Sequence, residues 1–192
     1  YNIQNFDVQE VYKFVGTMQK AAPIMKYVNG TFGSNMNMQM AIHPDLSPDL
    51  NSLNGTAGFK MPLANISGFP ALQQIVEQTK LKQLENLRIE NLDVKATVAN
   101  GRKLIAPFDT KVNNMKMTVG GSQGLDQTMD YAVAIDVPWK ELGQASSFAE
   151  GLLAKNPIKQ LNGMVPEVIR INLKVGGTFN KPVITVGKPD GT

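Results

Sequence analysis

The chain has 192 residues, of which 42% are hydrophobic and 18% are charged. These proportions are typical of a folded protein, and we expect one domain over residues 1–192. The formal net charge is only +3 and the lysines are scattered singly, so the sequence lacks the clustered basic surface of nucleic-acid-binding proteins and predicts no nucleic-acid partner. Cysteine is absent, which excludes disulfides, thiolate metal sites and cysteine nucleophiles.

The sequence also predicts that the chain does not cross a membrane. No run of about eighteen apolar residues occurs, and such a run is what a spanning helix requires. The chain begins at Tyr1 with neither a methionine nor a signal-like segment. We therefore expect a piece of a longer protein whose anchor or export signal lies outside it.

Residues 1–28 are expected to form a helical lead-in. Apolar residues recur at helical spacing from Phe6 onward, and Asn5 or Asp7 is placed to cap the start of the helix. Pro23 lies inside the pattern and should kink or end it. The pattern predicts an amphipathic helix that packs one apolar side on the rest of the chain.

Residues 29–192 are expected to form a sheet with two further helical segments. Met36, Met38 and Met40 alternate with amide side chains, which places the methionines on one face of a strand that ends before Pro44. A second strand over residues 53–63 follows. The first further helix is predicted directly after Phe69-Pro70.

Four alternating segments then predict an antiparallel meander. The first changes the parity of its apolar residues at Glu90-Asn91, where a β-bulge would restore a single apolar face. Asn100-Gly101 and the glycine-rich run 120–124 are expected to be hairpin turns. The predicted strands are residues 84–99, 104–109, 112–119 and 128–137.

The last part of the sequence predicts the second further helix and a closing hairpin. The helix covers residues 146–161, and the hairpin has its turn at Gly176-Gly177. The order of elements indicates an α+β fold. We expect a long, twisted antiparallel sheet, similar to a β-groove or half-barrel, with amphipathic helices packed on one side or end.

None of the motifs predicts catalysis, a cofactor or a metal site. His43 is the only histidine and reads as an ordinary loop residue beside Pro44. Asp130 and Asp136 share the polar face of one predicted strand, which favours solvated carboxylates over a catalytic pair. The run 120–124 is followed by a strand pattern and lacks the Lys-Ser/Thr ending of a phosphate-binding loop. We expect a protein that is not an enzyme.

The methionines and the other apolar residues of the strands are the candidate functional residues. Methionine gives a soft, polarizable surface that can repack around irregular apolar partners such as acyl chains. Two interpretations remain open at this point: an apolar trough that is open to ligand, or an ordinary sheet face covered by helices. The candidate lining residues are Met36, Met38, Met40, Met115, Met117, Val119, Tyr131, Val133 and Ile135.

Turns and strand starts along most of the chain, from about Gly30 onward, carry a family resemblance. They are Leu53–Gly58, Leu87–Ala99, Asn100–Arg102, Ala106–Phe108, Val119–Asp126, Asp130-Tyr131 leading into Val137-Pro138, and Gly177–Pro182. In this order they resemble the C-terminal region of AsmA-type envelope proteins. These motifs contain no catalytic residues.

The resemblance implies a periplasmic domain of a Gram-negative protein that is anchored in the inner membrane by an N-terminal helix. It implies a role in outer-membrane biogenesis or in phospholipid transport along an apolar β-groove, with phospholipid acyl chains and envelope proteins as the expected partners. A structural or docking module of an envelope assembly factor, with a closed core and no lipid binding, is the alternative.

Overall fold

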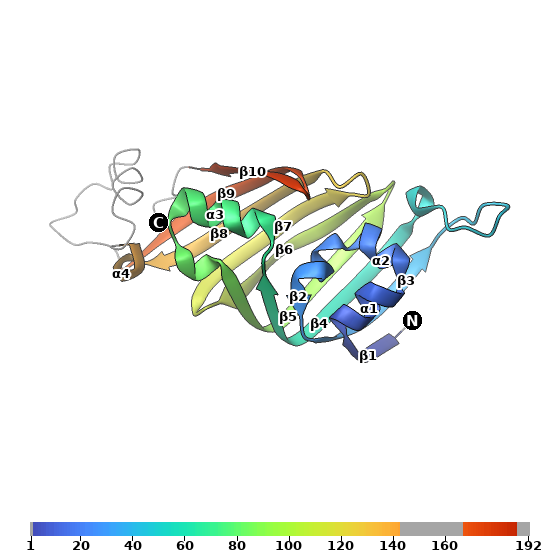
Figure 1. The fold of residues 1–192 in the computed structure, drawn as a ribbon, viewed down its shortest axis with the longest axis horizontal. Coiled ribbons are helices and arrows are strands. Elements are labelled where there is room, and N and C mark those ends of the chain that lie inside the picture. The colour runs from blue at the N-terminus through green and yellow to red at the C-terminus, as the bar shows by residue number, and fades with distance from the viewer. Residues whose placement is uncertain (1, 143–166, 188–192) are drawn as a thin grey trace.

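The computed structural model describes residues 2–142 and 167–187. These residues form a ten-stranded sheet in which every strand pair is antiparallel. The sheet is open, with β1 and β10 at its edges. Several short helices lie against it (Figure 1). The predicted helix over residues 146–161 falls outside the described residues.

The strands are β1 (Asn2–Asp7), β2 (Val28–Asn29), β3 (Thr31–Gln39), β4 (Asn54–Ser67), β5 (Asn86–Ala99), β6 (Arg102–Val112), β7 (Met115–Gly124), β8 (Met129–Pro138), β9 (Val168–Thr178) and β10 (Lys181–Val186). The helical segments are α1 (Val8–Phe14), α2 (Gly16–Ala21), η1 (Pro23–Tyr27), η2 (Leu50–Ser52), α3 (Pro70–Thr79), η3 (Lys82–Leu84) and α4 (Trp139–Leu142).

The predicted meander is confirmed. From β3 to β10, each strand lies beside the next strand in the sequence. The short strand β2 pairs with the far end of β4, where Val28 faces Ile66, while β3 pairs with the other end of β4. The helix predicted after Phe69-Pro70 is also present as α3, with Pro70 in its first turn and Leu72 and Ile75 buried.

The predicted lead-in is wrong at its start, because the chain begins with strand β1 rather than with a helix. Phe6 of β1 pairs with Phe32 of β3. The side chain of Asp7 then accepts hydrogen bonds from the backbone N–H groups of Gln9 and Glu10, so Asp7 is the N-cap that starts α1. The expected single helix is divided into α1, α2 and η1, and Pro23 opens the last of these.

Two predicted glycine turns are wrong as well, since both glycine pairs lie inside strands. Gly120-Gly121 belongs to β7 and Gly176-Gly177 belongs to β9. The chain reverses direction only after Gly124 and after Thr178. Likewise β6 extends to Val112, and the next turn is made by Asn113-Asn114, both of which have positive φ.

The bulge predicted at Glu90-Asn91 does not form. Instead, the paired strands β4 and β5 both change the parity of their buried residues at this level. Burial in β5 does switch parity there, and Asn91 has a φ of 53°. The pairing with β4 nevertheless continues in unbroken register through this point. Register is kept because β4 changes parity at the same level, from Met61 to Ala64, which are both buried. Neither strand therefore has an extra residue, and no bulge is needed.

The main core lies between one face of the sheet and the helices. In Figure 1, α1 and α2 lie over the side of the sheet that contains β3, β4 and β5, whereas α3 lies over the side that contains β8 and β9. Phe69, which precedes α3, stacks on Phe179 of the β9–β10 turn with ring centroids 5.2 Å apart, and Tyr27 of η1 joins them. We call the helix-bearing face the inner face and the opposite one the outer face.

A β-bulge does occur in β6, and its contact with Gly120 leads to a prediction about stability. The register between β6 and β7 shifts between Ile105 and Phe108, and the bulged Pro107 packs directly on Gly120. A Cβ atom added at Gly120 would lie 2.9 Å from Pro107 Cα and Cγ. We expect Gly120→Ala to lower the free energy of unfolding by about 1–3 kcal/mol in urea titrations, because the sheet must shift to admit the methyl group.

Gly58 offers the matched control, since an added Cβ there meets no atom within 4 Å. Gly58→Ala should leave the unfolding midpoint unchanged or raise it slightly, because alanine has less backbone freedom to lose on folding. Equal midpoints for the two variants would contradict the close contact between Pro107 and Gly120.

Candidate functional site

The inner face is a continuous surface that follows from the cross-strand register. Directly paired residues project to the same side of a sheet. Met36 pairs with Ala57, Ala57 pairs with Ala96, and the row continues across β6 and β7 to Tyr131. The strands β3 to β8 therefore contribute one row of inner-face residues that links the candidate residues of β3 with those of β8.

The candidate residues of β7 and β8 lie together and are covered. Met117 pairs with Ile135, and the two side chains are 8% and 2% exposed. Met115 is buried as well, and all three belong to the same core cluster as Leu72 of α3. The remaining three candidates on these strands, Val119, Tyr131 and Val133, are partly buried against this cluster. This half of the inner face is an ordinary hydrophobic core.

The candidate residues of β3 have a different environment. Met36 and Met38 are only partly buried, although both project from the inner face. Met40 lies beyond the last residue of β3 and is 40% exposed. Because β4, β5 and β6 separate β3 from β7, the predicted lining residues form two separate groups on the inner face.

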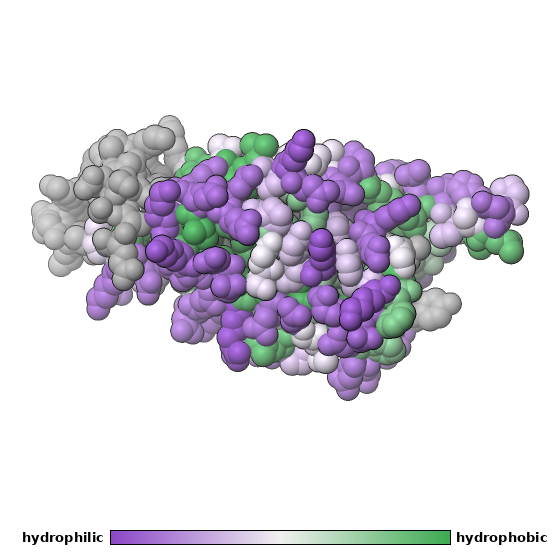
Figure 2. Space-filling view, in the orientation of Figure 1, coloured by the Kyte–Doolittle hydropathy of each residue, from purple (hydrophilic) through white to green (hydrophobic). Residues whose placement is uncertain are grey.

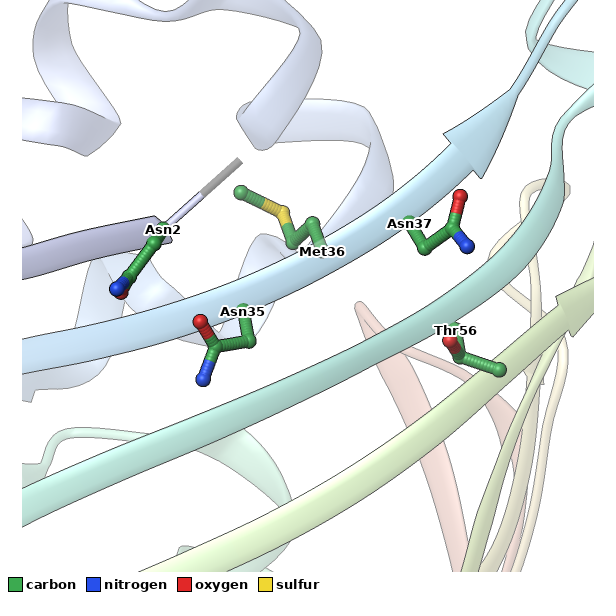
Figure 3. A pocket seen from close by; sticks show the side chains of 5 residues that line it. All are labelled: Asn2, Asn35, Met36, Asn37 and Thr56. Carbon is green, nitrogen blue, oxygen red and sulfur yellow. The ribbon is translucent and has the colours of Figure 1, made fainter.

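The hollows near this edge of the sheet are lined mainly by residues with polar or small side chains. One hollow of about 400 Å³ is lined by Met36 and by four polar residues, Asn2, Asn35, Asn37 and Thr56 (Figure 3). Met36 and Asn35 project to opposite sides of β3 in this view. A second hollow of about 510 Å³ continues over the outer face, past Lys60 and Lys95. Apart from Met36, neither hollow is lined by the large apolar and aromatic side chains of a typical small-molecule site.

Lys103 is a largely buried charged residue of the inner face that the sequence analysis did not single out. It pairs with Val98, so it projects from the inner face, and its ammonium group donates a hydrogen bond of 3.1 Å to the carbonyl oxygen of Ala21 at the end of α2. Burial lowers the pKa of Lys103 to about 8. The Asn100-Gly101 turn was the available signal, because a two-residue hairpin loop places Lys103 opposite Val98.

The neighbouring residue, Arg102, projects to the outer face and organises a polar cluster. Its guanidinium donates to the hydroxyl oxygens of Ser122 at 2.9 Å and Thr128 at 3.0 Å. Thr128 in turn donates to the carboxylate of Asp126, which lowers the pKa of that carboxyl group. Burial raises the pKa of the Tyr131 phenol to about 12, an effect that the positive charge of Arg102 opposes. The hydrogen bonds among Arg102, Thr128 and Asp126 fix the turn after β7.

The acidic residues of β8 are engaged in ion pairs. Asp136 accepts two hydrogen bonds from Arg170, at 2.7 and 3.0 Å, and Asp130 lies 3.6 Å from the ammonium group of Lys174. His43 is exposed, in the segment that follows β3. Within residues 2–142 and 167–187, no three histidine or acidic side chains are grouped so that they could hold a metal ion.

Comparisons with known proteins give no match to a family model, to a curated protein or to a solved structure. The resemblance to AsmA-type proteins consequently depends on the residues quoted above. Among the described residues, no helix is both long and apolar enough to cross a membrane.

Lys103 generates a stability prediction with a defined pH dependence. Its pKa is lower in the folded chain than in the unfolded one, so the ammonium form destabilises the fold below about pH 8 and this penalty disappears as the pH rises to 10.5. We expect Lys103→Met to raise the free energy of unfolding at pH 7 by up to about 3 kcal/mol. The gain should shrink toward zero near pH 10.5.

Urea titrations of both proteins at pH 7 and pH 10 measure this difference. Tyr131 and the other groups that titrate in alkali are common to both proteins, so the comparison isolates Lys103. If Lys103→Met raised the free energy of unfolding equally at both pH values, Lys103 would not be a buried charge with a lowered pKa.

Proposed function

We propose that this chain is a non-enzymatic periplasmic domain of an inner-membrane-anchored, AsmA-like protein, and that it contributes to outer-membrane biogenesis or phospholipid transport by contacting acyl chains. The observation that carries this proposal is the uneven cover of the inner face. Met117 and Ile135 are buried under helices, whereas Met36 and Met38 retain exposed surface on the same face. The family resemblance supplies the cellular setting.

The side of the inner face near Met38 suits a flexible apolar chain. Met38 pairs with Gly55, which has no side chain, and Met36 pairs with Ala57. The two methionine side chains therefore lie beside small residues on the neighbouring strand. Each methylene of an acyl chain that leaves water on such a surface contributes about 0.8 kcal/mol, and methionine adapts its shape to the ligand.

In this proposal, the buried half of the inner face around β7 and β8 stabilises the sheet and does not contact ligand. The burial of Met115, Met117 and Ile135 is also the observation that favours the alternative, a docking module without bound lipid. The two functions differ at one place only. Lipid transport requires ligand at β3, whereas the docking module leaves the methionines of β3 in contact with protein or water.

Photo-crosslinking residues at Met38 and at Met117 test the proposal. In living cells that express the full-length protein, we expect phospholipid adducts at Met38 and only protein adducts at Met117, because α3 and its neighbours exclude ligand from the second position. Mass spectrometry after extraction with organic solvent identifies the adducts. The absence of lipid at Met38, with Met117 still labelling protein, would leave the docking module as the function.

A pair of charge substitutions on the same strand gives the matched control. Met38→Asp places a carboxylate on the inner face and should reduce the amount of co-purified phospholipid, since an unpaired charge in contact with acyl chains is costly. Asn37→Asp places the same charge on the outer face, where Asn37 is exposed, and should leave the amount unchanged. Equal effects of the two substitutions would contradict an acyl-chain surface on the inner face.

A further inference from the structure

The segment between β3 and β4, residues 40–53, projects beyond the end of the sheet (Figure 1). We call it the arm. Hydrogen bonds join its two sides: the backbone N–H of His43 donates to Ser47 O at 2.9 Å, and that of Asp49 donates to Ala41 O at 3.0 Å. At its base, the hydroxyl of Ser52 accepts a hydrogen bond of 2.7 Å from the backbone N–H of Ala41. The arm is thus a structured hairpin.

Apolar exposure increases from the base of the arm to its tip. Met40, Ile42 and Leu46 are 40%, 64% and 83% exposed. Figure 2 shows hydrophobic residues on the lower side of this projecting end and hydrophilic residues on its upper side. Isolated exposed apolar residues are normal in proteins, but here three of them lie on one short hairpin.

The backbone of Leu46 adds an independent observation. Its φ is 65°, in the left-handed region, where glycine and asparagine are favoured and a leucine side chain is uncommon. A turn that served only to connect two strands would be more stable with glycine at this position. Strained backbone conformations cluster at functional sites, where the surrounding structure holds them in place.

The charge of the arm differs from that of the chain. No lysine or arginine occurs between Lys26 and Lys60, and the charged residues in that interval are Asp45 and Asp49, in a protein whose formal net charge is +3. Hydrogen bonds from Ser47 lower the pKa of Asp45, so its carboxylate is charged at neutral pH. Asp45 directly precedes Leu46, the apolar tip residue, in the sequence.

We propose that the arm is a docking element for a protein partner that presents an apolar pocket with a rim of lysine or arginine. Leu46 and Ile42 would enter the pocket, and Asp45 and Asp49 would face the basic rim. An anionic lipid surface fits the arm less well, because the arm brings negative charge and no positive charge to it. This inference does not depend on the acyl-chain contact, since it concerns residues beyond the end of β3.

Site-specific photo-crosslinking in cells that express the full-length protein tests the arm. We expect Leu46 and Ile42 to label the same protein, through peptides that combine apolar residues with lysine or arginine. A crosslinker at Val183, an apolar residue of β10 that is 58% exposed, should not label that protein. Phospholipid adducts, adducts with a second copy of this chain, or equal labelling from Val183 would each overturn the proposal.

Two further variants separate docking from folding. Asp45→Asn combined with Asp49→Asn removes both charges but keeps the side-chain oxygens that accept hydrogen bonds from the backbone N–H groups of Ser47 and Asn51, and it should greatly reduce labelling of the partner from Ile42. Leu46→Gly should reduce labelling from Ile42 by about tenfold, while the melting temperature stays the same or rises, since glycine accepts this φ without strain. Labelling that is unchanged after these charges are removed, or a Leu46→Gly variant that labels as well as the parent, would contradict the docking element.

Discussion

The burial of one apolar sheet face is the constraint on which the rest of the structure depends. An antiparallel sheet can leave one face in water, but its apolar face needs cover. Here α3 and the aromatic contact between Phe69 and Phe179 cover the part of the face near β9. The N-terminal side is covered by the shorter helices α1 and α2, which leave the methionines of β3 partly exposed. The candidate site is a consequence of this unequal cover.

Hairpin geometry places charge on both faces of the sheet without any charged motif in the sequence. Arg102 and Lys103 are adjacent, so β alternation directs them to opposite faces. On the outer face, Arg102 joins Ser122 and Thr128 in a partly buried polar cluster. On the inner face, Lys103 reaches the last carbonyl of α2, where the negative end of the helix favours a cation. One turn thus ties a helix to the sheet and also imposes a buried charge.

The sequence predicted the meander and α3 because their signals are local: period-two alternation in the strands and Pro70 before a helical pattern. The errors arose where tertiary contact decides. Gly120 reads as a turn residue, yet it lies inside β7 because Pro107 packs against it. Phe6 fits a helical pattern, but it lies in strand β1, where it pairs with Phe32 of β3. Neither partner can be identified from the local sequence, since each comes from a separate segment of the chain.

The same limit applies to the candidate site. Methionines at alternate positions share a face, but the sequence does not specify what lies opposite that face. Met117 is in the core, Met38 is partly exposed on the inner face, and Met40 belongs to the arm, although all three had the same local signal. Only the position of each strand relative to the helices separates these environments. Whether a methionine can contact a ligand therefore depends on how far the helices cover its strand, rather than on methionine content.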